Sequence, residues 1–198
     1  MSQVLEPNIF PSIFWMHQAL KNVTIQFNRA ERYERQTFRN RYQIYTAQGV
    51  VALSIPIENL TTKGSFYDVK ISYREKWNIN HWRTLVSAYK NAPYFEYFED
   101  DLKLLLLEET EYLWQLISLT NTWIFKTLQW PYQIEMIDRQ KTHAADFVAE
   151  QELLNQINFE PYFQTFSNRL GFQKNLSVLD LIFHCGNDSV DYLQKISV

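Results

Sequence analysis

Residues 3–27, QVLEPNIFPSIFWMHQALKNVTIQF, predict the first unit of the fold. Gln3–Glu6 is a short, apolar-leaning run that Pro7 stops, which is typical of a strand. Pro11 stands where helices commonly begin, and the residues after it follow helical spacing. Apolar and polar residues then alternate over 23–28, which predicts a second strand. A strand, a helix and a strand in this order indicate a parallel crossover unit, whose ligand usually lies at the carboxyl ends of the strands.

The next segments predict a hairpin and then a series of helices. Tyr42–Ala47 and Val50–Ile57 are β-rich runs that flank Gln48 and Gly49, a turn signal. Phe66–Ser72 also alternates and predicts a further strand. Helices are predicted over residues 77–92, 94–107, 108–130, 175–185 and 190–196, and a strand over 132–137.

Composition agrees with one folded domain. The 198 residues are 46% hydrophobic and 16% aromatic, with only four glycines and six prolines, which argues against a disordered chain. We therefore expect a single α/β domain over residues 1–198. Its small mixed sheet would contain the N-terminal strand-helix-strand unit and the β-hairpin, with several helices flanking it. Residues 138–158 are polar and weakly patterned, and we expect a polar connection there.

Charge and cysteine content bound the location and the partners. The net charge of −3 gives no global field that would attract nucleic acid. Cys185 is the single cysteine, which excludes an internal disulfide. Pro7 and Pro11 interrupt the N-terminal apolar residues, and the longest aliphatic run, Leu104–Leu107, is too short to cross a bilayer. We therefore expect a cytoplasmic protein with no membrane span and no nucleic-acid partner.

Known catalytic motifs are absent from the sequence. It has no glycine-rich phosphate loop, and its four histidines lack metal-ligand spacing, so we expect no metal and no cofactor. His81 is the best candidate for a general base, because histidine titrates near neutral pH. The alternative is a histidine at a helix start with no catalytic role. Asp180 stands among apolar residues, where a carboxylate needs a partner, and we expect an arginine from residues 32–41.

Arginines gather between the predicted second strand and the hairpin. Arg32, Arg35, Arg39 and Arg41 fall within ten residues. In an extended segment Arg35, Arg39 and Arg41 share one face, and in a helical segment Arg32, Arg35 and Arg39 do. Guanidinium groups bind carboxylate or phosphate with two hydrogen bonds, so either arrangement predicts a site for a small anionic substrate. The alternative is a solvated face paired with two nearby glutamates.

Aromatic residues could complete such a site. The rim of the first two strands would hold residues 6–10 and 28–33, next to the arginines. Tyr33, Trp82 and Tyr89 carry flat rings with a polar edge, which suit a sugar or a base. The alternative is that these rings fill the core.

Five stretches of the chain carry a family resemblance. They are LEPNIFPSIFWM at 5–16, RYERQTFRNRYQI at 32–44, GVVALSIPIE at 49–58, and the runs 67–101 and 160–193. The most specific motifs are Arg39-Asn40-Arg41, the run 88–95, and Asn175-Leu176-Ser177 with Asp180. In this order the stretches resemble the WbqC-like family, in the form of Bacteroidetes-type sequences. Glu6 stands where a glutamine is frequent in that family.

The resemblance implies a role in surface polysaccharide (O-antigen) biosynthesis, and transfer of glycine to a sugar has been suggested for the family. The arginines and aromatic residues fit a transferase that acts on an anionic or nucleotide-activated sugar, and the resemblance adds glycyl or similar acyl transfer as the reaction. A non-catalytic binding or interaction module and a nucleotidyl-transfer enzyme are the alternatives. The expected substrate-binding residues are Tyr33, Arg35, Arg39, Asn40, Arg41, Trp82 and Tyr89, and the expected catalytic residues are His81 and Asp180.

Overall fold

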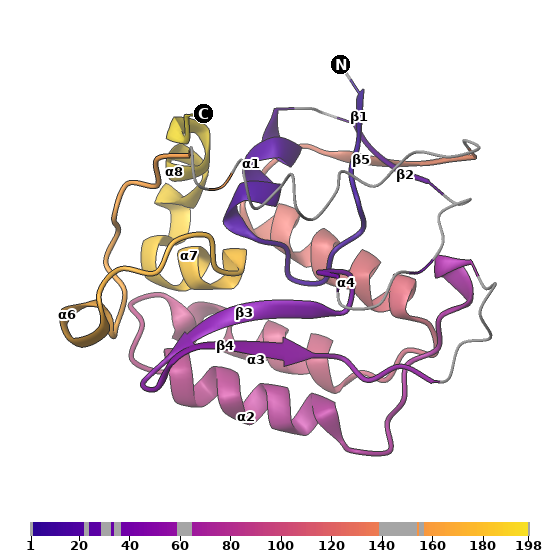
Figure 1. Cartoon of the computed structure of the whole chain (residues 1–198), viewed down its shortest axis with the longest axis horizontal. Coiled ribbons are helices and arrows are strands. Elements are labelled where there is room, and N and C mark those ends of the chain that lie inside the picture. The colour runs from indigo at the N-terminus through magenta and orange to yellow at the C-terminus, as the bar shows by residue number, and fades with distance from the viewer. Residues whose placement is uncertain are drawn as a thin grey trace.

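A three-stranded parallel sheet contains the first two strands of the chain (Figure 1). The computed structural model describes residues 2–21, 24–28, 33, 37–58, 65–138, 154 and 157–197. Within them, β1 (Ser2–Val4), β2 (Thr24–Asn28) and β5 (Gln133–Ile137) lie in the order β1-β2-β5, and both pairs are parallel. α1 (Ile13–Leu20) connects β1 to β2, so the predicted crossover unit is confirmed.

The predicted hairpin is also present, and it forms a sheet of its own. β3 (Arg41–Thr46) and β4 (Gly49–Ser54) pair antiparallel around a tight turn. Gly49 has a φ of 109°, a backbone conformation that favours glycine. The α/β class is therefore confirmed, with the parallel and antiparallel strands divided between two sheets.

The predicted strand over Phe66–Ser72 is wrong. Its first residues form a short 3₁₀-helix, η1 (Phe66–Asp68), because the Ser65 hydroxyl accepts the Tyr67 N–H and caps the turn. Lys70 and Ile71 make only isolated bridges, to Tyr112 and Ile57. The alternation in this segment therefore reflects burial against different neighbours and not a place in a sheet.

The helices after the hairpin follow the predicted order, apart from the short helix Ser167–Leu170, which was not predicted. They are α2 (Trp77–Tyr89), α3 (Phe95–Leu107), α4 (Leu113–Thr127), α6 (Ser167–Leu170), α7 (Val178–Cys185) and α8 (Ser189–Lys195), with the 3₁₀-helix η2 (Gly186–Asp188) between the last two. α4 begins five residues later than predicted, because the Glu111 carbonyl and the Leu113 N–H bond the backbone of residues 69–71. Gly186 ends α7 as predicted, since its φ is 54° and a Cβ there would meet the Tyr94 ring.

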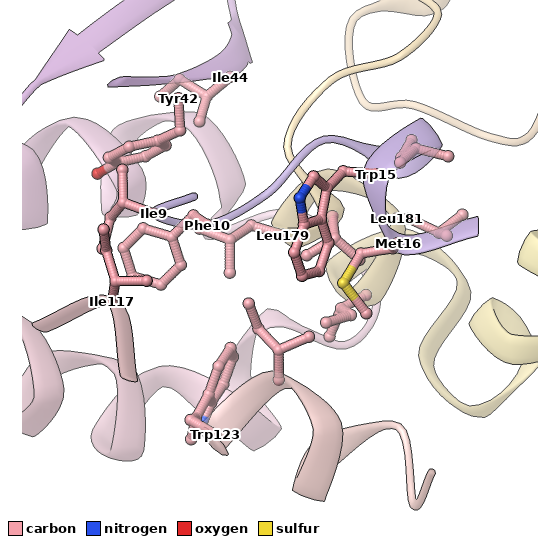
Figure 2. Packing of buried hydrophobic residues seen from close by; sticks show 14 of the residues in the cluster. Ile9, Phe10, Trp15, Met16, Tyr42, Ile44, Ile117, Trp123, Leu179 and Leu181 are labelled. Atoms are coloured by element: carbon pink, nitrogen blue, oxygen red, sulfur yellow. The ribbon is translucent and has the colours of Figure 1, made fainter. Parts of the chain in front are cut away.

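One hydrophobic core joins these elements (Figure 2). In Figure 1, α4 lies between the parallel sheet and the pair formed by α2 and α3, with α7 and α8 at one end. The core side chains come from the loop after β1, α1, β3, α4 and α7, and they include Ile9, Phe10, Trp15, Met16, Tyr42, Ile44, Ile117, Trp123, Leu179 and Leu181. The loop at residues 7–11 thus lies at the centre of the molecule, where strands and helices from distant parts of the chain meet.

Some of the sequence predictions fall outside the described residues. Arg32 and Arg35 are among them, as is most of the polar connection over 138–158. No helix in the described part of the chain combines the length and apolar character that a membrane span requires.

Candidate functional site

Where the structure describes it, the arginine segment is not one extended run or one helix, because only Arg41 belongs to a strand. Residues 37–40 form a bend and a turn that lead into β3. Arg39 is fully buried, its guanidinium lies 5.6 Å from the centre of the Phe66 ring, and its Nη2 lies 3.3 Å from Oε1 of Glu6. Arg39 is therefore held by an ion pair and a cation–π contact inside the protein.

Arg41 has a different environment, although it is only two residues away. Its Nε donates a hydrogen bond of 3.0 Å to the Ser54 hydroxyl at the surface of the hairpin. Among the described residues no carboxylate lies within ion-pair distance of Arg41. Its terminal guanidinium nitrogens remain available to a ligand, and they can bind carboxylate or phosphate with two hydrogen bonds.

A shallow hollow, called here the Arg41 hollow, lies beside this side chain. Its volume is about 10 Å³, which is room for about one water-sized group. The amino termini of α1 and α7 meet at it, because Ile13 N–H bonds Leu176 O and Val178 N–H bonds Pro11 O. The lining residues are Ile9, Phe10, Pro11, Ser12, Phe38, Arg41, Tyr42, Gln43, Asn175 and Ser177.

The protein already uses the backbone donors at these two helix starts. The Ser12 hydroxyl accepts from Trp15 N–H, Asn175 Oδ1 accepts from Phe14 N–H, and the Ser177 hydroxyl accepts from Leu179 N–H. The helix dipoles still favour negative charge at this place, but direct hydrogen bonds to an anion would come from Arg41. Phe10 (φ 39°) and Asn175 (φ 54°) line the same hollow in left-handed backbone conformations, and strain of this kind clusters at functional sites.

A second, apolar hollow, called here the α4 hollow, lies between α4 and the parallel sheet. Its volume is about 50 Å³. Pro7 and Phe27 line it, so it opens near the carboxyl ends of β1 and β2, where the crossover unit predicts a ligand. The lining residues are Pro7, Phe27, Phe66, Tyr67, Trp114, Ile117, Ser118, Ile134 and Met136.

The predicted general base, His81, lies inside the protein. Its residue is 5% exposed, its Nδ1 lies 3.1 Å from the Tyr42 hydroxyl, and the Trp77 ring packs against it. Burial lowers the pKa of His81 to about 4, so the imidazole is neutral at pH 7. His81 is not among the lining residues of either hollow, whereas its contact Tyr42 lines the Arg41 hollow.

The arginine partner predicted for Asp180 is wrong. Asp180 is fully buried and accepts hydrogen bonds from the hydroxyls of Tyr89 (2.9 Å) and Tyr162 (2.6 Å) and from Nε2 of Gln164 (3.0 Å). Burial and the nearby carboxylate raise the pKa of both tyrosines well above their ordinary value, so they stay protonated and donate. Three uncharged donors therefore hold the carboxylate, and no arginine is needed. His184 adds a contact, with Nδ1 3.5 Å from Asp180 Oδ1.

The remaining predicted binding residues divide between the site and the core. Asn40 closes the base of the hairpin by donating from Nδ2 to Ile55 O. Tyr89 is fully buried and also accepts the Tyr45 N–H. Trp82 stacks on Phe95, with ring centres 6.3 Å apart. Tyr33 is half-buried.

The structure therefore brings Arg39, Asn40 and Arg41 together on one turn, and it joins Tyr89 to Asp180 in a separate network. Trp114, Tyr162 and Gln164 were missed by sequence reasoning. Each is an aromatic or amide residue that belongs to no motif in the sequence, so nothing in the sequence pointed to a role for it. The described residues contain no group of three histidine, cysteine or acidic side chains placed to hold a metal ion.

Comparison with known proteins assigns the family. The model of the WbqC-like protein family matches residues 6–150, so the chain belongs to this family. It is also 25% identical over 200 residues to the uncharacterized protein Rv1507c of Mycobacterium tuberculosis, a match that covers 82% of this chain and 84% of that protein. No solved structure matches the chain significantly.

Proposed function

We propose that this WbqC-like protein binds an anionic, nucleotide-activated sugar and serves as a transferase in surface polysaccharide biosynthesis in the bacterial cytoplasm. The observation that carries the binding part is Arg41. It is a guanidinium with one serine contact and no carboxylate partner among the described residues, placed at a hollow where two helices begin. The positive helix ends add to the attraction for an anion.

The size of the Arg41 hollow favours a small anionic group over a large one. Room for about one water-sized group suits a phosphate or carboxylate oxygen that reaches in from the surface. The rest of the ligand then lies outside this hollow. Arg39 stays inside the protein, where Glu6 offsets its charge and Phe66 packs against its guanidinium, so the proposed anion contact is with Arg41.

The resemblance to the WbqC-like family supports the pathway and the reaction class of the proposal. The family is associated with surface polysaccharide gene clusters, and the suggested reaction, transfer of a glycyl or similar acyl group to a sugar, needs such a substrate. A base for this reaction would have to be a group that reaches the surface near Arg41, because His81 and Asp180 are both buried.

Thermal-shift measurements test the proposal. Nucleotide sugars, inorganic phosphate and free amino acids are added in turn, because a ligand that binds the native state raises the melting temperature. We expect a shift with nucleotide sugars that Arg41→Gln reduces, with affinity falling about tenfold or more for the loss of a charged hydrogen bond. Arg83→Gln, at an exposed position on α2, is the matched control. A shift of equal size in Arg41→Gln and in the native chain contradicts the proposal.

A non-catalytic binding module is the second candidate. The observation that favours it is the burial of both predicted catalytic side chains, His81 and Asp180. In that event nucleotide sugars bind and Arg41→Gln weakens them, but incubation with an acyl donor yields no acylated sugar by mass spectrometry.

A further inference from the structure

We propose that the α4 hollow binds the nucleobase of the nucleotide-activated sugar. This inference rests on the proposed function, because it names the part of that substrate that lies beyond the phosphate. The rings that line the hollow and the shortage of polar groups in its wall support it, together with the residues that link its lining to that of the Arg41 hollow.

Aromatic rings form the mouth and one side of the α4 hollow. Trp114 is 36% exposed, and its ring centre lies 5.9 Å from that of Tyr67, with the planes inclined at 50°. Phe66 packs edge-on against Tyr67 at 5.4 Å. A partly exposed indole in the lining of an apolar hollow is a surface on which a flat heterocycle can stack.

The wall favours a base over a sugar ring. Among the described lining residues, Ser118, Tyr67 and the indole N–H of Trp114 are the polar side-chain groups, and the Tyr67 hydroxyl donates to Sδ of Met136 at 3.7 Å. Sugar hydroxyls that leave water need hydrogen-bond partners, and an aliphatic and aromatic wall does not supply them. The volume of about 50 Å³ has room for roughly four water-sized groups, so one edge of a ring enters while its face rests on Trp114.

Neighbouring residues of the chain line the two hollows. Pro7 lines the α4 hollow and Ile9 lines the Arg41 hollow, and Cα atoms two residues apart lie within about 7 Å of each other. Arg39 provides a second link, because it follows Phe38 of the Arg41 hollow and packs over Phe66 of the α4 hollow. Because Pro7, Ile9 and Arg39 are themselves buried, a nucleotide that uses both hollows has to pass over the surface outside these linking residues.

Isothermal titration calorimetry with nucleosides that lack phosphate tests this inference. The probes are uridine, cytidine, thymidine, adenosine and guanosine, and the protein is the full chain. We expect at least one nucleoside to bind, and Trp114→Ala to weaken it about tenfold, as for the loss of one stacked base. Ser118→Leu, which fills the hollow from α4 without removing a ring, should abolish binding. Leu119→Ala, at an exposed position on the same helix, should leave the affinity unchanged.

The outcomes separate this inference from the proposed function. If no nucleoside binds while nucleotide sugars still depend on Arg41, the inference is overturned and the proposed function stands. If nucleosides bind at Trp114 while Arg41→Gln leaves nucleotide sugars unaffected, the proposed function fails and the base site stands. A nucleoside whose affinity neither Trp114→Ala nor Ser118→Leu changes also overturns the inference.

Discussion

Asp180 and Arg41 differ in how many hydrogen bonds the protein makes to their side chains. Asp180 is fully buried, and three uncharged donors from Tyr89, Tyr162 and Gln164 occupy its oxygens. Within the described part of the chain, the Arg41 side chain makes one hydrogen bond, to Ser54, and it lines a hollow. A charged group whose hydrogen-bonding positions are all filled by the protein stabilises the fold. A charged group with unfilled positions is available to a ligand.

Arg39 shows that neighbouring residues can fall on different sides of this division. It is as deeply buried as Asp180, and Glu6 and Phe66 contact its guanidinium. Two residues further on, the start of β3 turns Arg41 toward the surface. In the motif Arg39-Asn40-Arg41, Arg39 is therefore a buried cation, Asn40 hydrogen-bonds the backbone at Ile55, and Arg41 is a surface cation.

The largest expected effect comes from removing the carboxylate of Asp180. Asp180→Ala leaves two tyrosine hydroxyls and an amide buried without their acceptor, and we expect the free energy of unfolding to fall by about 3–5 kcal/mol. Urea denaturation followed by circular dichroism measures this loss. Asp191→Asn, an exposed carboxylate on α8, is the control and should change stability by less than about 0.5 kcal/mol. Equal losses in both variants would break the comparison.

Acid should destabilise the native chain through His81. The folded-state pKa of about 4 lies below the ordinary value of 6.5, so between these values the unfolded chain binds more protons. Stability therefore falls as the pH is lowered from about 6.5 to about 4, by about 3 kcal/mol in total. Burial also lowers the pKa of His17, which acts in the same direction.

The matched variant for this prediction is His81→Gln, which does not titrate in that range. Its stability should be less dependent on pH than that of the native chain over the same window. Parallel curves for the two proteins would show that His81 is not the group responsible.

Deleting one donor to Asp180 should have a smaller effect than deleting the carboxylate. Tyr162→Phe removes the hydroxyl that donates at 2.6 Å, and we expect a loss of about 2 kcal/mol for a hydrogen bond to a charged group. Tyr97→Phe is the control, because Tyr97 is 80% exposed. No difference between the two variants would mean that the remaining donors compensate fully.

The smallest effect on stability is expected at Arg41. Arg41→Gln should change the free energy of unfolding by no more than about 0.5 kcal/mol, because its one internal contact is at the surface. The same variant is expected to lose ligand affinity, so Arg41 would affect binding without affecting stability, the opposite of Asp180. A large loss of stability would instead place Arg41 with the residues that hold the fold.

Local patterns predicted most of the secondary structure. The crossover unit, the hairpin and the helix ends depend on short-range signals, such as Pro11 before α1, Gly49 in the hairpin turn and Gly186 after α7. The segment 66–72 misled the prediction, because alternation reports which side chains are buried and not what buries them.

The candidate site was harder to predict than the fold. The partners of Asp180 were assigned to arginine by charge alone, whereas tyrosine hydroxyls and an amide 16–91 residues away satisfy it. The α4 hollow depends on Pro7, Phe66, Trp114 and Met136 meeting in space, and no spacing in the sequence encodes that meeting. The arginine motif was visible in the sequence. The turn before β3 decides that Arg39 is buried and Arg41 lies at the surface, and the sequence does not show this.

The hydroxyl of Tyr89 has a practical consequence for where the polypeptide can be cut. It accepts the Tyr45 N–H and donates to Asp180, and the Phe183 ring, from the same helix as Asp180, packs 5.1 Å from its own. The family match ends at residue 150, before that helix. A recombinant fragment that ends at residue 150 would lose these contacts between the hairpin and α7. We therefore expect it to aggregate, and a recombinant protein should extend through α8.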